Sequence, residues 1–560
     1  MSLLTLSTLS LLILLNLSLT SPSYAVNATS PSVTPAAACK SSIYPKLCRS
    51  ILSPITKSPP SNNNPYEYGR FSVKQCLKQA RRTSAILNKL LSKGRSTLRH
   101  VDASGALDDC RQLSDLNAEY LETISSELGS IGPLNRAGSD RVRTLLSAIL
   151  TNQQTCYDGL EASRNRGRVV GELFDPVFVN ASRLYSVSLG LVTTALEGRG
   201  KGRSRPAVDR THSRSALGSS GPMTWFSMIR RGLLEGIRSG VRVNASVTVS
   251  QDGSANFTTI GDAVAFAPNN TDISDGYFVI FVKKGMYQEY ILIPKNKKNL
   301  MLVGDGMNRT IVTGNHSIID GWTTYSSATF SVHGERFVAM DMTFENTAGP
   351  QKHQAVAVRN SADLSSFYRC SFLGYQDTLY AHSLRQFYRD CHVYGTVDFI
   401  FGNAASVFQG CTLYARKPMP GQKNAFTAQG RTDPNQVTGI SIQNCTVTGA
   451  MELAMDPNGT ENYLGRPWKE YSRTVYMQSF IDGLIEPAGW LEWNETFALD
   501  TLFFGEYENY GPGANVSRRV LWAGYMKMNA TQALNFTVEN FTTADTWLPF
   551  SDIPFIAGLL

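Results

Sequence analysis

Two aspartates, Asp377 and Asp398, lie 21 residues apart in segments that look alike. The segment FYRCSFLG at 367–374 is echoed by FYRDCHVYG at 387–395, and more loosely by FQGCTLYA and IQNCTVTG further along the chain. Short β-branched and aromatic runs that repeat at this period, each closed by glycine, asparagine or aspartate, predict a solenoid of β-coils. One turn of such a coil brings the chain back about 4.8 Å higher. We therefore expect the two carboxylates to be stacked neighbours.

Two amides extend the same register, because Gln354 lies 22 residues before Gln376. Two carboxylates one strand spacing apart cannot both ionise cheaply, so one tends to hold a proton while the other stays charged as a base or nucleophile. Adjacent amides suit a developing oxyanion, whereas glycosidic cleavage uses two carboxylates and no oxyanion hole. The spacing leaves both chemistries open, together with a purely structural role for the aspartates in turns.

The downstream motif LGRPWK places Arg466 close to Trp468. An indole can stack on a sugar ring and a guanidinium can hold a carboxylate through its fork of donors, so the pair favours an acidic sugar polymer over a purely structural role. His382 and Ser383 do not indicate a serine hydrolase, because the chain has no G-x-S-x-G motif. With no C-x-x-C pattern and only seven histidines, we expect no metal site.

The first 25 residues contain the apolar run LLILLNLSL and end in Ser23-Tyr24-Ala25. This pattern predicts a cleaved signal peptide rather than a membrane anchor. Fourteen N-x-S/T sequons follow residue 25, which indicates a secreted, glycosylated protein. At 560 residues with 42% hydrophobic content, the chain is long enough for more than one domain with a buried core.

Residues 26–196 are predicted to form an all-α four-helix bundle. Apolar side chains recur at helical spacing from 72 to 196, with breaks near 129–133 and 164–171. Two cysteine pairs in this part suit disulfides of a secreted chain, and Cys76 is left over as a buried thiol. The predicted pairs are Cys39 with Cys48 and Cys110 with Cys156.

Residues 197–240 are rich in glycine, serine and arginine and are predicted to be a linker. The linker ends in a candidate protease site, whose basic pair and leucines are Arg230, Arg231, Leu233 and Leu234. From 241 to 560, apolar runs of four to six residues broken by glycine or asparagine favour a parallel β-helix over a sandwich. Its cysteines are expected to form two further disulfides, Cys370 with Cys391 and Cys411 with Cys445.

The formal net charge of +8 is unevenly distributed. Residues 1–240 hold 30 basic and 16 acidic side chains, a net +14, whereas residues 241–560 hold 23 and 29, a net −6. The basic character therefore belongs to the N-terminal part, and we expect no nucleic-acid partner. The charges suggest instead that the basic bundle covers an acidic cleft until it is removed.

The motifs GYQDTLY, GTVDFIFGNA and LGRPWK, with KHQAVAVR before them and PAGW and GEYENYGPGA after them, closely resemble those of plant pectin methylesterases. The resemblance covers 241–560. The N-terminal part, with TNQQTCYDG around Cys156, resembles the pectin methylesterase inhibitor domain that such enzymes carry as a pro-region, which implies that it inhibits or chaperones the enzyme before processing. The resemblance implies a right-handed parallel β-helix that hydrolyses methyl esters of galacturonate units in pectin and releases methanol, with no metal or organic cofactor.

The resemblance also implies roles for individual residues. Asp398 is the expected nucleophile, and Asp377 is the expected general acid and then general base. Gln376 and Gln354 are expected to stabilise the anionic intermediate, and Arg466 to orient Asp398 and hold the substrate.

Further contacts and partners follow from the same resemblance. Trp468 is expected to stack on a sugar ring, and Thr324 matches another substrate-contact position. The expected partners are methyl-esterified pectin and inhibitor proteins of the four-helix type, including the chain's own pro-region. We expect a monomer in the cell wall, without stable membrane insertion after the signal peptide is removed.

Two other functions remain as alternatives. One is a β-helix glycosidase or lyase that acts on the same polymer, which would shorten it instead of releasing methanol. The other is a non-catalytic wall protein whose bundle inhibits other esterases. The sequence RRGLL departs from the usual processing motif by a glycine between the basic pair and the leucines, so the cleavage position is not fixed by the resemblance.

Overall fold

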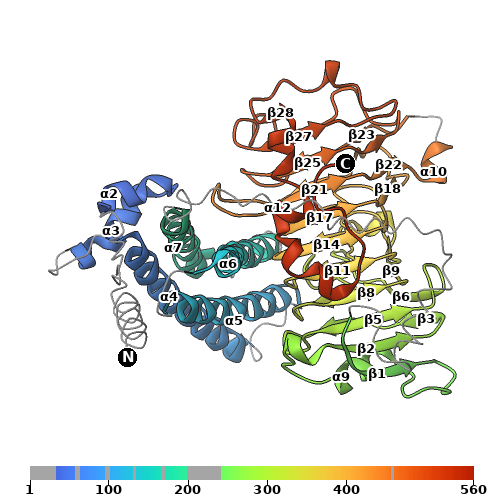
Figure 1. Ribbon diagram of the computed structural model, residues 1–560, viewed down its shortest axis with the longest axis horizontal. Helices are drawn as coiled ribbons and strands as arrows, with labels where there is room; N and C mark the ends of the chain where they lie inside the picture. Colours follow the sequence, from blue (N-terminus) through green and yellow to red (C-terminus); the bar gives the residue numbers. More distant parts are fainter. Residues whose placement is uncertain are drawn as a thin grey trace, which may run out of the picture.

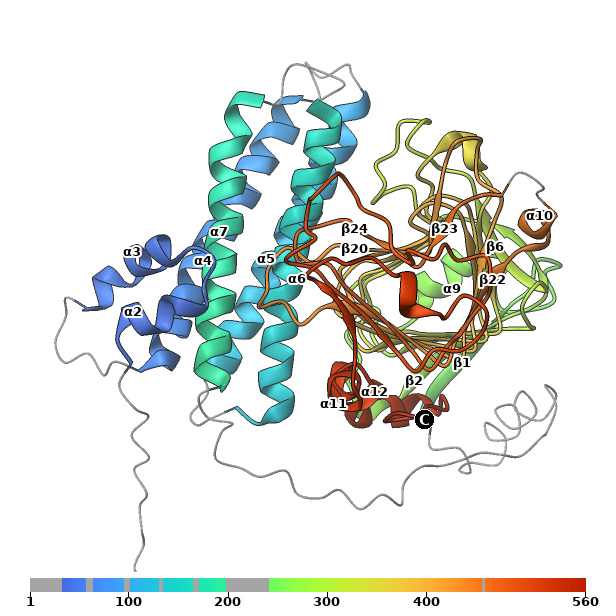
Figure 2. The ribbon, with the colours of Figure 1, turned by 90° about the horizontal axis from the view of Figure 1, so that it is seen from above.

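The computed structural model describes residues 33–56, 64–94, 101–129, 134–164, 171–197, 241–455 and 459–560. Within these ranges, a helical N-terminal domain lies beside a β-helix that forms the C-terminal domain (Figures 1 and 2). None of the described helices is both long and apolar enough to span a bilayer. The predicted signal peptide at 1–25 and the processing residues Arg230, Arg231, Leu233 and Leu234 lie outside the described residues.

Four long helices form the bundle, as predicted. Each helix is longer than the apolar pattern from which it was predicted. The sides of the helices that face one another bury a core that includes Val73, Leu121, Ile149 and Leu189. A short arm of α2 (Pro35–Ala38), η1 (Cys39–Ser41) and α3 (Pro45–Thr56) packs on α4 and α7. The bundle helices are α4 (Pro65–Gly94), α5 (Val101–Gly129), α6 (Arg136–Arg164) and α7 (Gly171–Glu197).

Both disulfides predicted for the bundle are present. Cys39 of η1 is bonded to Cys48 of α3, and Cys110 of α5 is bonded to Cys156 of α6. Cys76 is a fully buried thiol, as expected for the cysteine left over. The second bond ties the two helices that face the β-helix to each other.

The β-helix consists of three long sheets in which all neighbouring strands are parallel, so the predicted fold class is confirmed. Each turn of chain contributes one strand to each sheet, which places residues about 21 positions apart directly above one another, as in the pairs Leu379↔Ile400 and Tyr388↔Phe408. The largest sheet has eleven strands, which are β1 (Val243–Val249), β2 (Tyr277–Val282), β5 (Leu300–Gly304), β8 (Val338–Met340), β11 (Ser365–Tyr368), β14 (Arg385–Arg389), β17 (Ala405–Gln409), β21 (Gly439–Gln443), β25 (Arg473–Met477), β27 (Phe503–Tyr507) and β28 (Tyr525–Lys527).

The other two sheets complete each coil. The eight-stranded sheet contains β3 (Gly285–Gln288), β6 (Thr310–Gly314), β9 (Thr343–Asn346), β12 (Ser371–Leu373), β15 (His392–Gly395), β18 (Thr412–Ala415), β22 (Thr446–Gly449) and β26 (Phe480–Ile481). The seven-stranded sheet lies on the side of the β-helix that faces the bundle, and it positions the candidate site. Its strands are β4 (Ile291–Ile293), β7 (Phe330–Val332), β10 (Val358–Asn360), β13 (Leu379–Ala381), β16 (Ile400–Gly402), β20 (Thr427–Gln429) and β24 (Arg466–Pro467).

Short helices close the β-helix. Helix α9 (Ile260–Phe266) packs against β1, β2 and β4 and buries Ile260 and Val264 at the N-terminal end. Near the C-terminus, α12 (Val538–Thr542) packs on the eleven-stranded sheet at β17, beside α11 (Ala530–Leu534). A small two-stranded sheet of β19 (Asn424–Ala425) and β23 (Asn462–Tyr463), and helix α10 (Met451–Ala454), lie in the loops between coils.

Stacked side chains fill the interior of the β-helix. The rings of Phe367, Tyr388 and Phe408 form one such stack, with centroids 5.4 and 4.4 Å apart. These residues occupy equivalent positions in successive coils, so the similar segments seen in the sequence are the units of the solenoid. Buried aromatic stacks of this kind supply a large part of the apolar area that stabilises the fold.

The two disulfides predicted for the β-helix are wrong. Cys370, Cys391, Cys411 and Cys445 are buried free thiols that lie above one another, and the backbone N–H of Cys391 points to the Sγ of Cys411 at 3.4 Å. Their spacing in sequence reflects the coil period. In a stack the side chains of successive coils point in the same direction, whereas a disulfide needs two Cβ–Sγ vectors that turn toward each other.

Candidate active site

Asp377 and Asp398 lie one coil apart at the edge of the seven-stranded sheet. Each stands two residues before a paired strand residue, Leu379 in β13 and Ile400 in β16, and the N–H of Asp377 donates to the carbonyl of Val397 at 3.1 Å. Both aspartates have positive φ, 64° and 54°, a left-handed conformation that aspartate tolerates better than most residues. The shared conformation presents the two carboxyl groups to the same groove.

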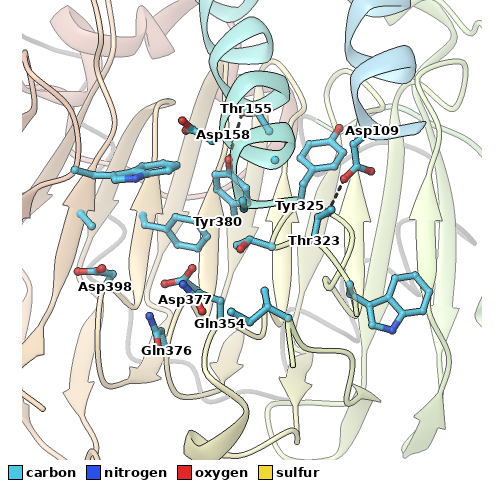
Figure 3. Close-up of a pocket in the computed structure, with 18 of the residues that line it drawn as sticks. Asp109, Thr155, Asp158, Thr323, Tyr325, Gln354, Gln376, Asp377, Tyr380 and Asp398 are labelled. Atoms are coloured by element: carbon cyan, nitrogen blue, oxygen red, sulfur yellow. Dashed lines mark hydrogen bonds between the residues drawn. The ribbon is translucent and has the colours of Figure 1, made fainter. Parts of the chain in front are cut away.

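All seven site residues predicted from the sequence line one cavity of about 350 Å³ (Figure 3). They come from five different turns of the chain, and the short spacing between parallel strands brings them together. These residues are Thr324, Gln354, Gln376, Asp377, Asp398, Arg466 and Trp468. None of the cysteines predicted to form disulfides is among the described residues that line this cavity.

The charges in the groove are arranged asymmetrically. Arg466 donates from Nε to Oδ1 and from Nη2 to Oδ2 of Asp398, both at 2.7 Å. Asp377 is buried, and no described residue holds it in this way. Burial raises its pKa well above the ordinary value and repulsion from Asp398 adds to this, while Arg466 opposes it. Two neighbouring carboxyl groups with such different surroundings suit one proton donor and one charged group.

Aromatic side chains that were not predicted from the sequence form a wall of the groove. The rings of Tyr380 and Phe401 stack with centroids 4.2 Å apart, and Trp468 meets Phe401 edge-on at 5.9 Å. The guanidinium of Arg466 lies 4.4 Å from the ring centroid of Trp493. The sequence held a signal for the first pair, because each ring follows a site aspartate by three residues in matching motifs.

The bundle closes the groove from the opposite side. In Figure 3, Thr155 and Asp158 of α6 and Asp109 of α5 lie across the cavity from the two aspartates, and all three line it. Thr155 Oγ1 is hydrogen-bonded to His382 Nε2 at 3.0 Å. The apolar part of the contact joins residues of both domains, including Leu107, Cys156, Phe178, Tyr325, Val356, Tyr380, Phe401 and Ala428.

Two carboxylates of the bundle make polar contacts with the groove. Asp109 accepts hydrogen bonds from the hydroxyls of Thr323 and Ser326, both at 2.5 Å, and burial raises its pKa. Asp158 forms an ion pair with Lys469 at 2.8 Å, next to Trp468 on the rim. The net basic charge of the N-terminal part therefore does not describe how the bundle meets the groove, because acidic side chains make these contacts.

Comparison with known proteins assigns both domains. The pectinesterase family profile matches residues 246–545, which is more than half of the chain. The chain belongs to the pectinesterase family. Residues 34–191 match the profile of the plant invertase/pectin methylesterase inhibitor family. The predicted resemblance is thus confirmed for both parts of the chain.

Curated relatives match this pectinesterase over most of its length. It is 53% identical to "Probable pectinesterase/pectinesterase inhibitor 47" of Arabidopsis thaliana over 94% of this chain and 86% of that protein. It is 48% identical to "Pectinesterase/pectinesterase inhibitor PPE8B" of Prunus persica over 81% of this chain and 83% of that protein. Among solved structures, the pectin methylesterase from carrot matches with a TM-score of 0.55 and 51% identity, covering 56% of this chain and 98% of the carrot chain.

Family membership separates two chemistries that the residue spacing had left open. Paired carboxylates alone allow ester or glycosidic cleavage, but the family is one of ester hydrolases. The carrot chain is covered almost entirely by little more than half of this chain.

Proposed function

We propose that residues 241–560 hydrolyse the methyl esters of galacturonate units in pectin, with Asp398 as nucleophile and Asp377 as general acid and base. The observation that carries this proposal is the asymmetry of the two carboxyl groups. Arg466 holds both oxygens of Asp398 at 2.7 Å, whereas Asp377 lies buried beside it with a raised pKa.

In the first half of the reaction, an oxygen of Asp398 attacks the carbonyl carbon of the ester. The negative charge that develops on the carbonyl oxygen accepts hydrogen bonds from the side-chain amides of Gln354 and Gln376, which line the same cavity. When the tetrahedral intermediate collapses, the bond to the methoxy group breaks. Asp377 gives its proton to the departing oxygen, so methanol leaves as a neutral molecule.

In the second half, water cleaves the acyl-enzyme. Asp377, now a carboxylate, takes a proton from the water as it attacks the acyl carbon. The bond to Asp398 breaks, Asp398 is a carboxylate again and Asp377 holds a proton again. The galacturonic acid product carries the second proton of the water and gives it up to solvent as it leaves. Arg466 keeps Asp398 in one orientation through both steps and lies where it can also hold a substrate carboxylate.

The walls of the groove bind the polymer. Trp468 offers a ring face to a sugar, with Thr324 as a polar contact and Trp493 as a further aromatic surface. Pyranose rings carry apolar faces and hydroxyl edges, so a groove that combines aromatic rings with hydroxyl and amide groups suits a chain of galacturonate units.

The bundle acts as a built-in inhibitor in this proposal. Thr155, Asp158 and Asp109 line the cavity that the substrate would need to enter, and two of them are carboxylates, the charge that de-esterified galacturonate carries. The bundle therefore blocks the groove by occupying the polymer's place. The separate inhibitor proteins of the same helical type are expected to bind the processed enzyme at this groove.

We also propose the division of the chain that this function requires. Residues 1–25 are a signal peptide, 26–196 the inhibitory bundle, 197–240 the linker that is cut, and 241–560 the enzyme. Secretion into the cell wall follows from the signal peptide and the sequons, and the processed enzyme acts as a monomer without metal or organic cofactor.

Methanol release from highly methylated pectin tests this function, measured together with the number of new reducing ends. Residues 241–560 are expected to release methanol without shortening the polymer, and the uncut chain to release far less. Shortening of the polymer without methanol would instead indicate a glycosidase or lyase. Equal activity of the cut and uncut chains would overturn the inhibitory role but not the esterase.

A further inference from the structure

A second cavity of about 350 Å³ lies between the bundle and the β-helix, away from the catalytic groove. Its bundle side comes from the N-terminal half of α6 and the C-terminal half of α7, and its other side from the starts of β14 and β25 and from the loop after β20. The arginines that line it are Arg136, Arg143, Arg385, Arg431 and Arg473. The cavity has a single acidic lining residue, Asp140.

Two of these arginines form no ion pair with a carboxylate in the part of the chain that the structure describes, although Asp433 attracts Arg431 from a greater distance. Arg431 is only 9% exposed and donates from Nε to the carbonyl of Gln436 at 3.0 Å, and Arg473 donates from Nε to the carbonyl of Thr438 at 2.7 Å. Among the residues that the structure describes, neither has an acidic side chain within 4.0 Å. Nη2 of Arg431 also donates to the carbonyl of Pro434. Nη2 of Arg473 donates to the carbonyls of Gln436 and Thr438. Among the described residues, the Nη1 group of each arginine has no hydrogen-bond partner and can donate into the cavity.

The neighbouring carboxylates are already engaged. Asp363 forms two hydrogen bonds with Arg385, at 3.0 and 2.7 Å. Asp433, next to Arg431 in the loop, accepts the hydroxyl of Ser186 at 2.5 Å and the backbone N–H of Asn435 at 2.8 Å. The cavity therefore has an excess of positive charge that the surrounding side chains do not neutralise.

This arrangement is unfavourable without a counter-ion. Burial lowers the pKa of Arg473 well below its ordinary value, with further lowering by Arg431 and Arg143, and burial lowers that of Arg431 to about 10. A guanidinium does not give up its proton near neutral pH, so both arginines stay charged. The folded state is therefore destabilised by the desolvation of these charges and by their mutual repulsion. Because the charges come from both domains, this repulsion also opposes docking of the bundle.

Neutral donors complete the lining. The hydroxyl of Thr193 is buried without a hydrogen-bond partner among the described residues, and it borders the cavity beside Thr194. Thr144 of α6 lies on the same bundle side. Asn435 lines the opposite side from the loop after β20, where its amide already donates to Ser41 and Asp433. Guanidinium forks together with hydroxyl and amide donors form the set of groups that binds oxyanions.

We propose that this cavity binds a small oxyanion with two or more negative charges, which bridges Arg143 of the bundle with Arg431 and Arg473 of the β-helix. The anion removes the repulsion between the two domains and so strengthens their contact. Inorganic phosphate and the carboxylates of a short galacturonate oligomer offer the same chemistry, and the test separates them. Binding of the anion does not depend on the catalytic roles proposed above. The expectation that a stronger contact between the domains also strengthens inhibition does rest on the proposed function.

The experiment is calorimetric titration of the uncut chain with inorganic phosphate and, separately, with digalacturonate, at an ionic strength held constant with sodium chloride. Arg143→Gln and Arg473→Gln are compared with Arg518→Gln, which alters an exposed arginine that does not line the cavity. We expect at least tenfold weaker binding in the first two variants and unchanged binding in the control. Binding should also raise the Tm of the wild type more than that of Arg143→Gln.

The two anions identify the source of the ligand. Tighter binding of phosphate assigns the site to inorganic oxyanions, and tighter binding of digalacturonate assigns it to the product of the esterase; either outcome supports the proposal. No binding of either anion to the folded wild type overturns it, as does equal binding by Arg143→Gln and the wild type. Arg143 is included because Arg473 also holds backbone carbonyls, so that its replacement could disturb the fold.

Discussion

Arg466 and Asp398 lie two coils apart on the site face of the solenoid, with β20 between their strands, and are joined by two hydrogen bonds of 2.7 Å. The pair fixes the position of one carboxylate, while its neighbour, Asp377, forms no ion pair with any residue that the structure describes. This division of roles is the feature on which the proposed reaction depends.

Arg466→Lys tests the importance of the two-point contact. A lysine keeps the charge but cannot hold both oxygens of Asp398, so the nucleophile should lose its fixed orientation. We expect kcat to fall about 10²-fold with a smaller change in KM. Steady-state kinetics on methylated pectin measure this, with circular dichroism to verify the fold. An unchanged kcat would show that Asp398 does not need orienting.

Asp377→Asn tests the raised pKa through stability. Folding raises the pKa of this carboxyl group, so the group stabilises the folded state fully at a pH below its unfolded pKa of about 3.8. This contribution is lost as the pH rises through the higher pKa of the folded state. At pH 7 the uncut Asp377→Asn variant should therefore have a higher Tm than the wild type, and the difference should shrink toward pH 3.

Asparagine also tolerates the positive φ at this position, so the substitution adds no backbone strain. Asp500→Asn, at an exposed position, serves as the control and should leave Tm unchanged. Activity of Asp377→Asn should fall about 10²- to 10⁴-fold, because the departing methanol loses its proton donor. A Tm difference that is independent of pH would contradict the assigned proton.

Asp158→Asn tests how the bundle holds the groove. Loss of the ion pair with Lys469 should weaken docking and raise methanol release by the uncut chain roughly five- to tenfold. Glu161→Gln, on the same helix and exposed to solvent, is the matched control. If both variants behave like the wild type, the ion pair does not contribute to inhibition.

The thiol stack gives a chemical prediction. Five of the nine cysteines are free, so titration of the denatured, unreduced protein should give five thiols per chain. The disulfides first expected from the sequence would leave only Cys76. A value near one thiol would therefore restore that interpretation and contradict the stack.

The sequence predicted much of the site because the solenoid converts a period in sequence into neighbours in space. Gln354, Gln376, Asp377 and Asp398 could be grouped by counting residues, and Arg466 joined them through its motif. The same period misled the assignment of the cysteines, because counting shows which residues are neighbours but not which way their side chains point.

The contacts between the two domains could not be predicted from the sequence. Asp109 and Asp158 are ordinary acidic residues on amphipathic helices, and nothing in their spacing shows what they face. The arginines of the second cavity come from four segments separated by up to 337 residues, and docking brings the two of the bundle to the three of the β-helix. Net charge per domain therefore predicted a basic inhibitor on an acidic cleft, whereas the contacts combine acidic and basic side chains on both sides.

The most direct test of the esterase mechanism is methanol release from highly methylated pectin by residues 241–560, compared with Asp398→Asn in the same segment. We predict steady release by the wild type and release at least 10³-fold slower by the folded variant, because the attacking oxygen is lost. Release by the folded Asp398→Asn variant at a rate close to that of the wild type would show that Asp398 is not the nucleophile.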